Sequence, residues 1–105
     1  MDRLVRWTPD AATSLERITA YIAQDSPVYA AAFATRVLNA VNDLKVFPES
    51  GHVVPEFDQP DVREIPVRNH RVIYQLVGGE IRVLFIVHGS RDLSATWSPP
   101  GRAAP

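Results

Sequence analysis

The sequence has no cysteine and only one lysine, Lys45, and it lacks a long apolar run. The absence of cysteine excludes disulfides and thiolate metal sites. Apolar runs such as Val83–Val87 are far shorter than the roughly 20 residues of a membrane-spanning helix. The N-terminal residues MDRLVRWTPD contain no apolar segment of the kind that directs secretion. We therefore expect a cytoplasmic protein that does not enter a membrane.

The length and composition indicate one folded domain. With 105 residues the chain has the common size of a single domain and is too short for two cores. Apolar residues make up 46% and charged residues 22%, which is the ordinary balance of a globular protein. We predict a single domain over residues 1–96 and a disordered tail over residues 97–105.

The basic residues are unevenly placed, although the formal net charge is only −1. Ten of the eleven are arginine, and six of these follow residue 61. Arginine makes planar, two-pronged contacts with phosphate or carboxylate that lysine cannot make. A GC-rich genome explains a high arginine count, but it does not explain this crowding. The C-terminal half is therefore the more promising place for a binding surface.

Two N-terminal segments have the pattern of amphipathic helices. The sequences Thr8-Pro9-Asp10 and Ser26-Pro27 each combine a capping side chain with a proline at the first helical position. Apolar residues then recur every three or four positions over residues 11–22 and 30–44. The short link between them predicts an antiparallel helical hairpin, whose apolar face needs a sheet to cover it.

The rest of the chain has the pattern of strands. A short strand is expected at residues 4–7, and three longer ones at Asp61–Val67, His70–Val77 and Glu80–His88. The pair Gly78-Gly79 is a two-residue hairpin signal, whereas residues 48–60 read as a loop. We predict an α+β fold, with the helical hairpin packed on one face of a mainly antiparallel sheet of about four strands.

The hairpin register assigns side chains to the two faces of this sheet. It pairs Tyr74 with Val83 and Val72 with Phe85 on an apolar face that should receive the helices. The opposite, outer face combines large apolar residues with charged ones, which is typical of a surface that binds a partner. That outer face is predicted to carry Arg71, Arg82, His88, Ile73, Leu84 and Ile86, and also Glu64 if the turn before His70 has two residues.

The motifs between residues 48 and 93 resemble those of the ParE/RelE toxin superfamily. They are PESGHVVPE at 48–56, VRE at 62–64, HRVIY at 70–74 and IRVLFIVHGSRDL at 81–93. The resemblance implies a RelE/ParE-like fold and the toxin role of a type II toxin–antitoxin system, which causes growth arrest and plasmid stabilization. It also implies a ParD/RelB-like antitoxin as partner, and no cofactor.

The superfamily contains two activities. ParE-type toxins inhibit DNA gyrase by binding, whereas RelE- and YoeB-type toxins cleave mRNA on the ribosome. Metal-free RNA cleavage needs a base, a cation for the phosphate and an acid. Val62 and Glu64 stand where the RelE pattern has lysines. The YoeB pattern fits better, because it makes Glu56 the base, Arg71 the phosphate-binding cation and His88 the acid.

The ParE pattern fits with the fewest departures, so we predict a gyrase-binding toxin without catalytic residues of its own. The YoeB-like ribonuclease and a non-toxic binding module of the same fold remain alternatives. For Arg71 an ion pair with Glu64 is an equal alternative to target binding, and Trp97 has the alternative of closing the edge of the core. No histidine has metal-ligand spacing, so no metal is expected. The predicted target-binding surface comprises Arg71, Arg82, His88, Arg91 and Trp97.

Overall fold

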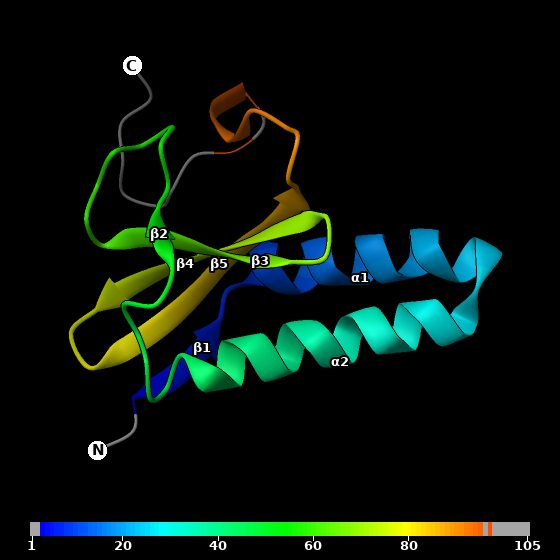
Figure 1. Ribbon diagram of the computed structural model, residues 1–105, viewed down its shortest axis with the longest axis horizontal. Helices are drawn as coiled ribbons and strands as arrows, with labels where there is room; N and C mark the ends of the chain where they lie inside the picture. Colours follow the sequence, from blue (N-terminus) through cyan, green and yellow to red (C-terminus); the bar gives the residue numbers. More distant parts are fainter. Residues whose placement is uncertain (1–2, 96, 98–105) are drawn as a thin grey trace.

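The computed structural model describes residues 3–95 and residue 97, and it has two helices that run along one face of a sheet (Figure 1). The elements in chain order are β1 (Leu4–Trp7), α1 (Pro9–Asp25), α2 (Pro27–Asp43), β2 (His52–Val53), β3 (Val62–Val67), β4 (His70–Val77), β5 (Glu80–His88) and a 3-10 helix (Leu93–Ala95). The predicted α+β fold is confirmed. Of the predicted tail, only Trp97 lies within the described residues.

The sheet has the strand order β1-β5-β4-β3-β2 and therefore five strands rather than about four. The additional strand is β2, which pairs antiparallel with β3 inside the segment that was expected to be a loop. Two residues are too short for a strand period to show in the sequence. The first strand, which the sequence could not place, runs parallel to β5 and pairs Leu4 with Glu80 and Trp7 with Val83.

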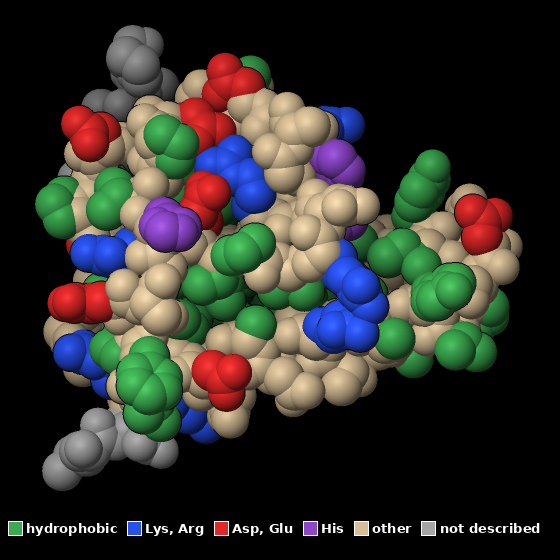
Figure 2. Space-filling view, viewed as in Figure 1, with side chains coloured by type: hydrophobic (Ala, Val, Ile, Leu, Met, Phe, Trp, Pro, Cys, Tyr) green, Lys and Arg blue, Asp and Glu red, His purple; other side chains and the backbone are tan. Residues whose placement is uncertain are grey.

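Both helices begin where the capping signals predicted. The hydroxyl of Thr8 accepts a hydrogen bond from the Ala11 N–H, and the hydroxyl of Ser26 accepts one from the Tyr29 N–H. The Thr8 hydroxyl also donates to the Val83 carbonyl at 2.9 Å, which fixes the start of α1 to β5. The helical hairpin continues past the sheet, and hydrophobic side chains gather on this projecting part (Figures 1 and 2).

A β-bulge in β5 overturns part of the predicted face assignment. Tyr74 pairs with Val83 as expected, but Ile73 pairs with Phe85, so that Leu84 is an extra residue on β5. An extra residue inverts the alternation of faces beyond it. Val72 therefore pairs with Ile86 and not with Phe85. Nothing in the run of large apolar residues around the bulge marks its position in the sequence.

The predicted exposed outer face is also wrong, because the sheet is covered on both sides. Ile73 and Leu84 are 0% and 1% exposed, and they pack with Val54 and Leu93 from the segments that cross this face. Ile86 lies in the other core, under the helices. The helix-side core consists of Ala11, Phe33, Val37, Val41, Val67, Val72, Val83 and Ile86.

The segment after α2 is held against the sheet at Gly51. The Gly51 N–H donates to the hydroxyl of Tyr74 at 3.0 Å, and this hydroxyl donates to the Pro48 carbonyl at 2.8 Å. A Cβ atom at residue 51 would lie 2.5 Å from the carbonyl oxygen of Glu64 and 2.6 Å from the Tyr74 hydroxyl. Only glycine fits this close approach without rearrangement.

Among the described residues, neither helix has the length and apolar character to cross a membrane.

Candidate functional site

The structure divides the predicted target-binding surface into separate places. Arg71 and Arg82 share the outer face, but Arg82 pairs across from Gln75, four residues or about 13 Å along β4 from Arg71. The Arg82 side chain donates to Glu80 beside the hairpin turn. The bulge carries His88 to the helix side of the sheet, so the expectation that it shares a face with Arg71 is wrong.

Arg71 is enclosed by two carboxylates. The turn before His70 has two residues, and it places Glu64 beside Arg71 on the outer face, as the face analysis predicted. Nε of Arg71 donates to Glu64 at 3.0 Å, and Nη1 and Nη2 each donate to one Glu56 carboxylate oxygen at 2.8 Å. Nη2 also donates to Glu64, and Nη1 donates to the Arg91 carbonyl at 3.1 Å. All five N–H groups of the guanidinium are therefore in use.

Both carboxylate oxygens of Glu56 accept hydrogen bonds inside the protein. Its Oε2 atom accepts a further hydrogen bond from the Leu93 N–H at 2.8 Å, which fixes the 3-10 helix to the outer face. The hydrogen bonds from Arg71, together with that from Leu93, lower the pKa of Glu56 to about 2. Only 16% of the Glu56 side chain and 11% of the Arg71 side chain are exposed. We call Glu56, Glu64 and Arg71 the outer-face ion cluster, and its saturated contacts indicate a structural role.

The predicted catalytic combination of Glu56, Arg71 and His88 is brought together only in part. Glu56 and Arg71 contact each other, but His88 lies on the opposite face of the sheet. A carboxylate with a pKa of about 2 is a weak general base at neutral pH. These three residues therefore do not form the arrangement that metal-free RNA cleavage needs.

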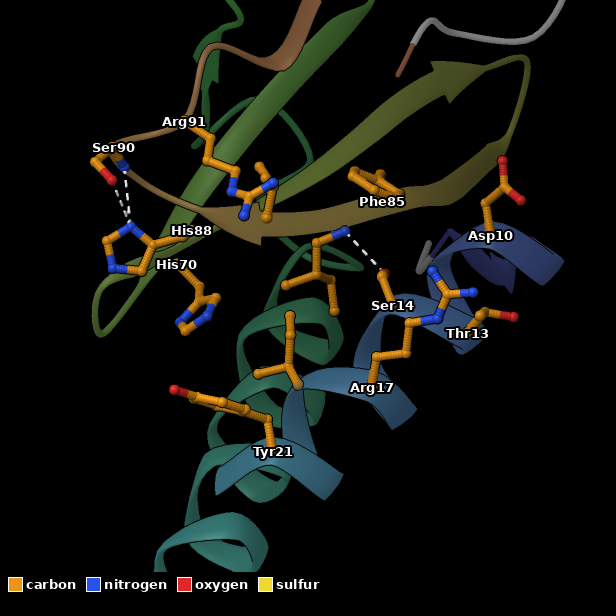
Figure 3. Close-up of a pocket in the computed structure, with 13 residues that line it drawn as sticks. Asp10, Thr13, Ser14, Arg17, Tyr21, His70, Phe85, His88, Ser90 and Arg91 are labelled. Atoms are coloured by element: carbon orange, nitrogen blue, oxygen red, sulfur yellow. Dashed lines mark hydrogen bonds between the residues drawn. The ribbon is translucent and has the colours of Figure 1, made fainter. Parts of the chain in front are cut away.

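A second group of ionisable side chains lines a pocket of about 600 Å³ between α1 and the end of β5 (Figure 3). We call it the helix-side pocket. Ser14 sets its geometry, because its hydroxyl donates to the Ala11 carbonyl at 2.9 Å and accepts from the Ile86 N–H at 3.0 Å. This contact joins α1 to β5 beyond the end of β1. The polar residues of the pocket include Asp10, Thr13, Ser14, Arg17, Tyr21, His70, His88, Ser90 and Arg91.

Two histidines meet at one end of the helix-side pocket. The ring centroids of His70 and His88 are 5.4 Å apart, and the ring of His70 also packs on Phe33 at 4.9 Å. Burial, followed by the proximity of His88, lowers the pKa of His70. Nδ1 of His88 accepts from the Ser90 N–H and contacts the Ser90 hydroxyl at 2.7 Å, so Nε2 is the ring atom left for another partner.

The two arginines of the helix-side pocket differ from Arg71. Arg17 extends from α1, and Arg91 approaches from the segment after β5, on the other side of the pocket (Figure 3). Within the part of the chain that the structure describes, neither guanidinium makes a hydrogen bond or an ion pair. Of the residues that the structure describes, Asp10 supplies the one carboxylate that lines the pocket, and it accepts from the indole N–H of Trp97 at 3.2 Å.

Trp97 packs at the edge of the molecule's second core. Its ring stacks on Phe85 at 5.3 Å with an angle of 6°, and it meets Phe57 edge-on at 6.1 Å. Of the two roles predicted for Trp97, this packing corresponds to closing the edge of the core.

No group of three or more metal-ligating side chains occurs among residues 3–95 and 97.

Sequence reasoning missed the contribution of α1 to the helix-side pocket. Arg17 and Tyr21 lie outside the apolar stripe of the predicted helix, and the predicted placement of His88 on the outer face separated it from them. Ser14 was the available signal, because it is a polar residue at helical spacing between Ala11 and Ile18 on the apolar stripe, and in the structure it is only 7% exposed. Polar groups buried in this way are hydrogen-bonded, which points to a contact with the sheet.

The comparison with family models gives a match over residues 5–93 to the ParE toxin of the type II toxin–antitoxin system parDE. The chain belongs to this family. The predicted superfamily is thereby confirmed, and the protein is a ParE-type toxin by family. A search of curated proteins gave no significant match.

Solved structures of toxin–antitoxin systems have the same fold. The chromosomal ParDE system from P. aeruginosa matches with a TM-score of 0.67 and 24% identity, over 82% of this chain and 95% of that one. The RelBE2 toxin–antitoxin complex from Mycobacterium tuberculosis matches with a TM-score of 0.57 and 17% identity, over 84% of this chain and 92% of that one. At these identities the likeness establishes the fold alone.

Proposed function

We propose that this ParE-family chain inhibits DNA gyrase by binding to it, without catalysis of its own, and that a cognate antitoxin neutralises it. The observation that carries the choice is the saturation of Arg71. All its donors are used inside the protein, so it has none left for a scissile phosphate. The family match supplies the toxin role.

The ribonuclease alternative is the weaker one on chemical grounds. The low pKa of Glu56 removes the base, and the bulge separates His88 from the outer-face ion cluster. The net charge of −1 also lacks the basic excess that proteins bound to ribosomal RNA usually carry. These features favour a protein target over RNA.

The proposal is tested with the purified chain, purified gyrase and a relaxed plasmid. We expect the chain to inhibit ATP-dependent supercoiling and to leave mRNA intact on translating ribosomes in a parallel reaction. Cleaved mRNA that becomes full length again with His88→Ala would replace the proposal with the ribonuclease. A chain that affects neither reaction and does not arrest growth would be the non-toxic binding module.

The antitoxin is expected to be encoded next to the toxin, and both structural neighbours come from toxin–antitoxin systems. Co-expression of a short neighbouring reading frame should restore growth to cells that express the chain. Gyrase acts in the cytoplasm, which is therefore the proposed location. Plasmid stabilization follows where the pair is carried on a plasmid, because cells that lose it also lose the antitoxin.

A further inference from the structure

We propose that the helix-side pocket binds a small phosphate monoester, with its phosphate between the guanidinium groups of Arg17 and Arg91 and an apolar ring against the lining of the pocket. The ligand class is a compact phosphorylated metabolite and not a macromolecule. The site is separate from the outer-face ion cluster. The inference goes beyond gyrase inhibition and does not rest on it, because binding is measured on the purified chain alone.

The two walls of the helix-side pocket are held in place by hydrogen bonds. The α1 wall is joined to β5 by the hydroxyl of Ser14, which accepts from the Ile86 N–H at 3.0 Å. The opposite wall is the segment after β5, where the Gly89 N–H donates to a backbone carbonyl of the β3–β4 turn at 2.7 Å. Further along this segment, the Arg91 carbonyl accepts from Arg71 at 3.1 Å. A site on a fixed backbone loses little conformational freedom when a ligand binds.

These walls carry two cationic side chains whose donors are free. Arg17 extends from α1 and Arg91 from the segment after β5, and they lie on opposite sides of the pocket (Figure 3). Neither guanidinium makes a hydrogen bond or an ion pair among residues 3–95 and 97. The nearby carboxylate of Asp10 accepts instead from the indole N–H of Trp97. Two guanidinium groups on either side of one space can both donate to the oxygens of one anion.

The mixture of donors favours a phosphate over a carboxylate. The Ser90 N–H donates to Nδ1 of His88, so this atom is an acceptor and the proton of the neutral ring lies on Nε2. His88 lines the pocket, which therefore has an imidazole N–H as well as two guanidinium groups, from separate elements of the fold. A phosphate monoester has three acceptor oxygens in a tetrahedral arrangement, whereas the two oxygens of a carboxylate share one plane with their lone pairs.

The apolar lining sets the nature of the rest of the ligand. Ile18, Phe85 and Ile86 line the same pocket as the two arginines. Its volume of about 600 Å³ lies within the range of about 300–1,000 Å³ that small-molecule sites have. Inorganic phosphate alone would leave the apolar lining in water. A ligand that joins a phosphate to an apolar ring satisfies both parts of the pocket.

The charges of the pocket match a single phosphate and not a nucleic-acid backbone. Asp10 lies at the end of the pocket where α1 begins, and its carboxylate would repel a second phosphate. The chain as a whole carries a net charge of −1, without the basic excess that backbone binding requires. A monoester with one phosphate avoids this repulsion and uses both arginines.

The probes are phenyl phosphate, inorganic phosphate and benzoate, and their dissociation constants for the purified chain are measured by isothermal titration calorimetry. We expect phenyl phosphate to bind about tenfold more tightly than inorganic phosphate, because its ring covers the apolar lining. It should also bind about tenfold more tightly than benzoate, which has the same ring but carries less charge and fewer acceptor oxygens.

Removal of either pocket arginine should weaken the binding of phenyl phosphate. Arg17→Gln and Arg91→Gln are each expected to raise its dissociation constant by about tenfold or more. Arg36→Gln is the matched control, because Arg36 is an exposed arginine on α2 that does not line the pocket, and its loss changes the net charge by the same amount. It should change the affinity less than about twofold. Circular dichroism verifies that each variant is folded.

The ring signals of the histidines in the nuclear magnetic resonance spectrum locate the bound probe. The chain has three histidines, of which His70 and His88 line the pocket. His52 lies on β2, at the opposite edge of the sheet from β1. Phenyl phosphate should shift the signals of His70 and His88 and leave that of His52 in place.

Several results would overturn the proposal. One is an affinity for phenyl phosphate that is undetectable or no higher than that for benzoate. Another is binding that Arg17→Gln and Arg91→Gln leave unchanged, or that shifts the signal of His52 in place of those of His70 and His88. A third is tighter binding of a 5′-phosphorylated oligonucleotide than of phenyl phosphate, since this would assign the pocket to the end of a nucleic acid.

Discussion

The two faces of the sheet use arginine in opposite ways. On the outer face, Arg71 gives every donor to Glu56, Glu64 and a backbone carbonyl. On the helix side, Arg17 and Arg91 line a pocket and have no partner among the described residues. A motif that contains arginine does not reveal which of these roles the residue has. The number of donors already in use inside the fold decides it.

The largest expected effect comes from removing Arg71. In Arg71→Met, two mostly buried carboxylates lose their shared cation, and breaking a buried pair in this way costs about 3–5 kcal/mol. Urea denaturation followed by circular dichroism measures the free energy of unfolding. A loss of growth arrest in this variant would then report unfolding and not a missing target contact.

Arg17→Met is the matched control on the other face and should change the free energy of unfolding by less than about 0.5 kcal/mol. The triple variant Arg71→Met, Glu56→Gln, Glu64→Leu should recover much of the lost stability, because it removes the unpaired charges. If Arg71→Met alone is as stable as the parent, the outer-face ion cluster is not structural.

A smaller loss is expected from Gly51→Ala. The added Cβ atom has to displace the Glu64 backbone or the Tyr74 ring, and overpacking of this kind costs about 1–3 kcal/mol. Thermal unfolding of this variant measures the cost. Gly79→Ala is the control, because a Cβ atom there meets no other group within 4 Å. Equal losses in the two variants would contradict the role of Gly51 in holding the segment after α2 against the sheet.

The outer-face ion cluster also predicts a dependence of stability on acid. The pKa of Glu56 is lower in the folded chain, at about 2, than in the unfolded chain, where a glutamate has about 4.5. The stabilisation is therefore complete above pH 4.5 and is lost as the pH falls towards 2. It amounts to about 2 kcal/mol after a discount for the solvent that still reaches the carboxylate. Urea denaturation from pH 6 to pH 2 measures it, and Glu56→Gln should flatten this part of the profile.

The helix-side pocket predicts a weaker effect at higher pH. The folded chain lowers the pKa of His70, so the unfolded chain binds the proton more readily. Stability should therefore begin to fall as the pH drops below about 6.5, the ordinary value for histidine. We expect this effect to be smaller than that of Glu56, because the neighbouring His88 and Arg17 are exposed. Removal of this slope by His70→Gln would support the assignment, and an unchanged slope would contradict it.

Much of the fold could be predicted because its signals are local. The capping residues Thr8 and Ser26 gave the helix starts, and Gly78-Gly79 gave the β4–β5 hairpin with its first pairs. The bulge at Leu84 could not be predicted, since it depends on how two cores compete for the large apolar residues of β5. That single residue decides where Ile86 and His88 lie. It therefore decided which residues form the candidate site.

The ion pair of Arg71 with Glu64 followed from strand parity, and it was predicted as one of two alternatives. Strand parity did not indicate the participation of Glu56, because this residue reaches Arg71 from a loop that crosses the outer face; only the resemblance to YoeB placed the two residues in one site. The role of Arg17 also needed the structure, since no periodic pattern shows which end of the sheet a helix residue approaches. Tertiary contacts between segments distant in sequence account for most of the missed features.

The contrast between the two faces can be tested most directly by the nuclear magnetic resonance spectrum of the arginine Nε–H groups, recorded for the exchange of each group with water. The account predicts that the Arg71 Nε–H exchanges slowly with water, because it is hydrogen-bonded to Glu64, while the Nε–H groups of Arg17 and Arg91 exchange rapidly. An Arg71 Nε–H that exchanges as fast as those of Arg17 and Arg91 would contradict it.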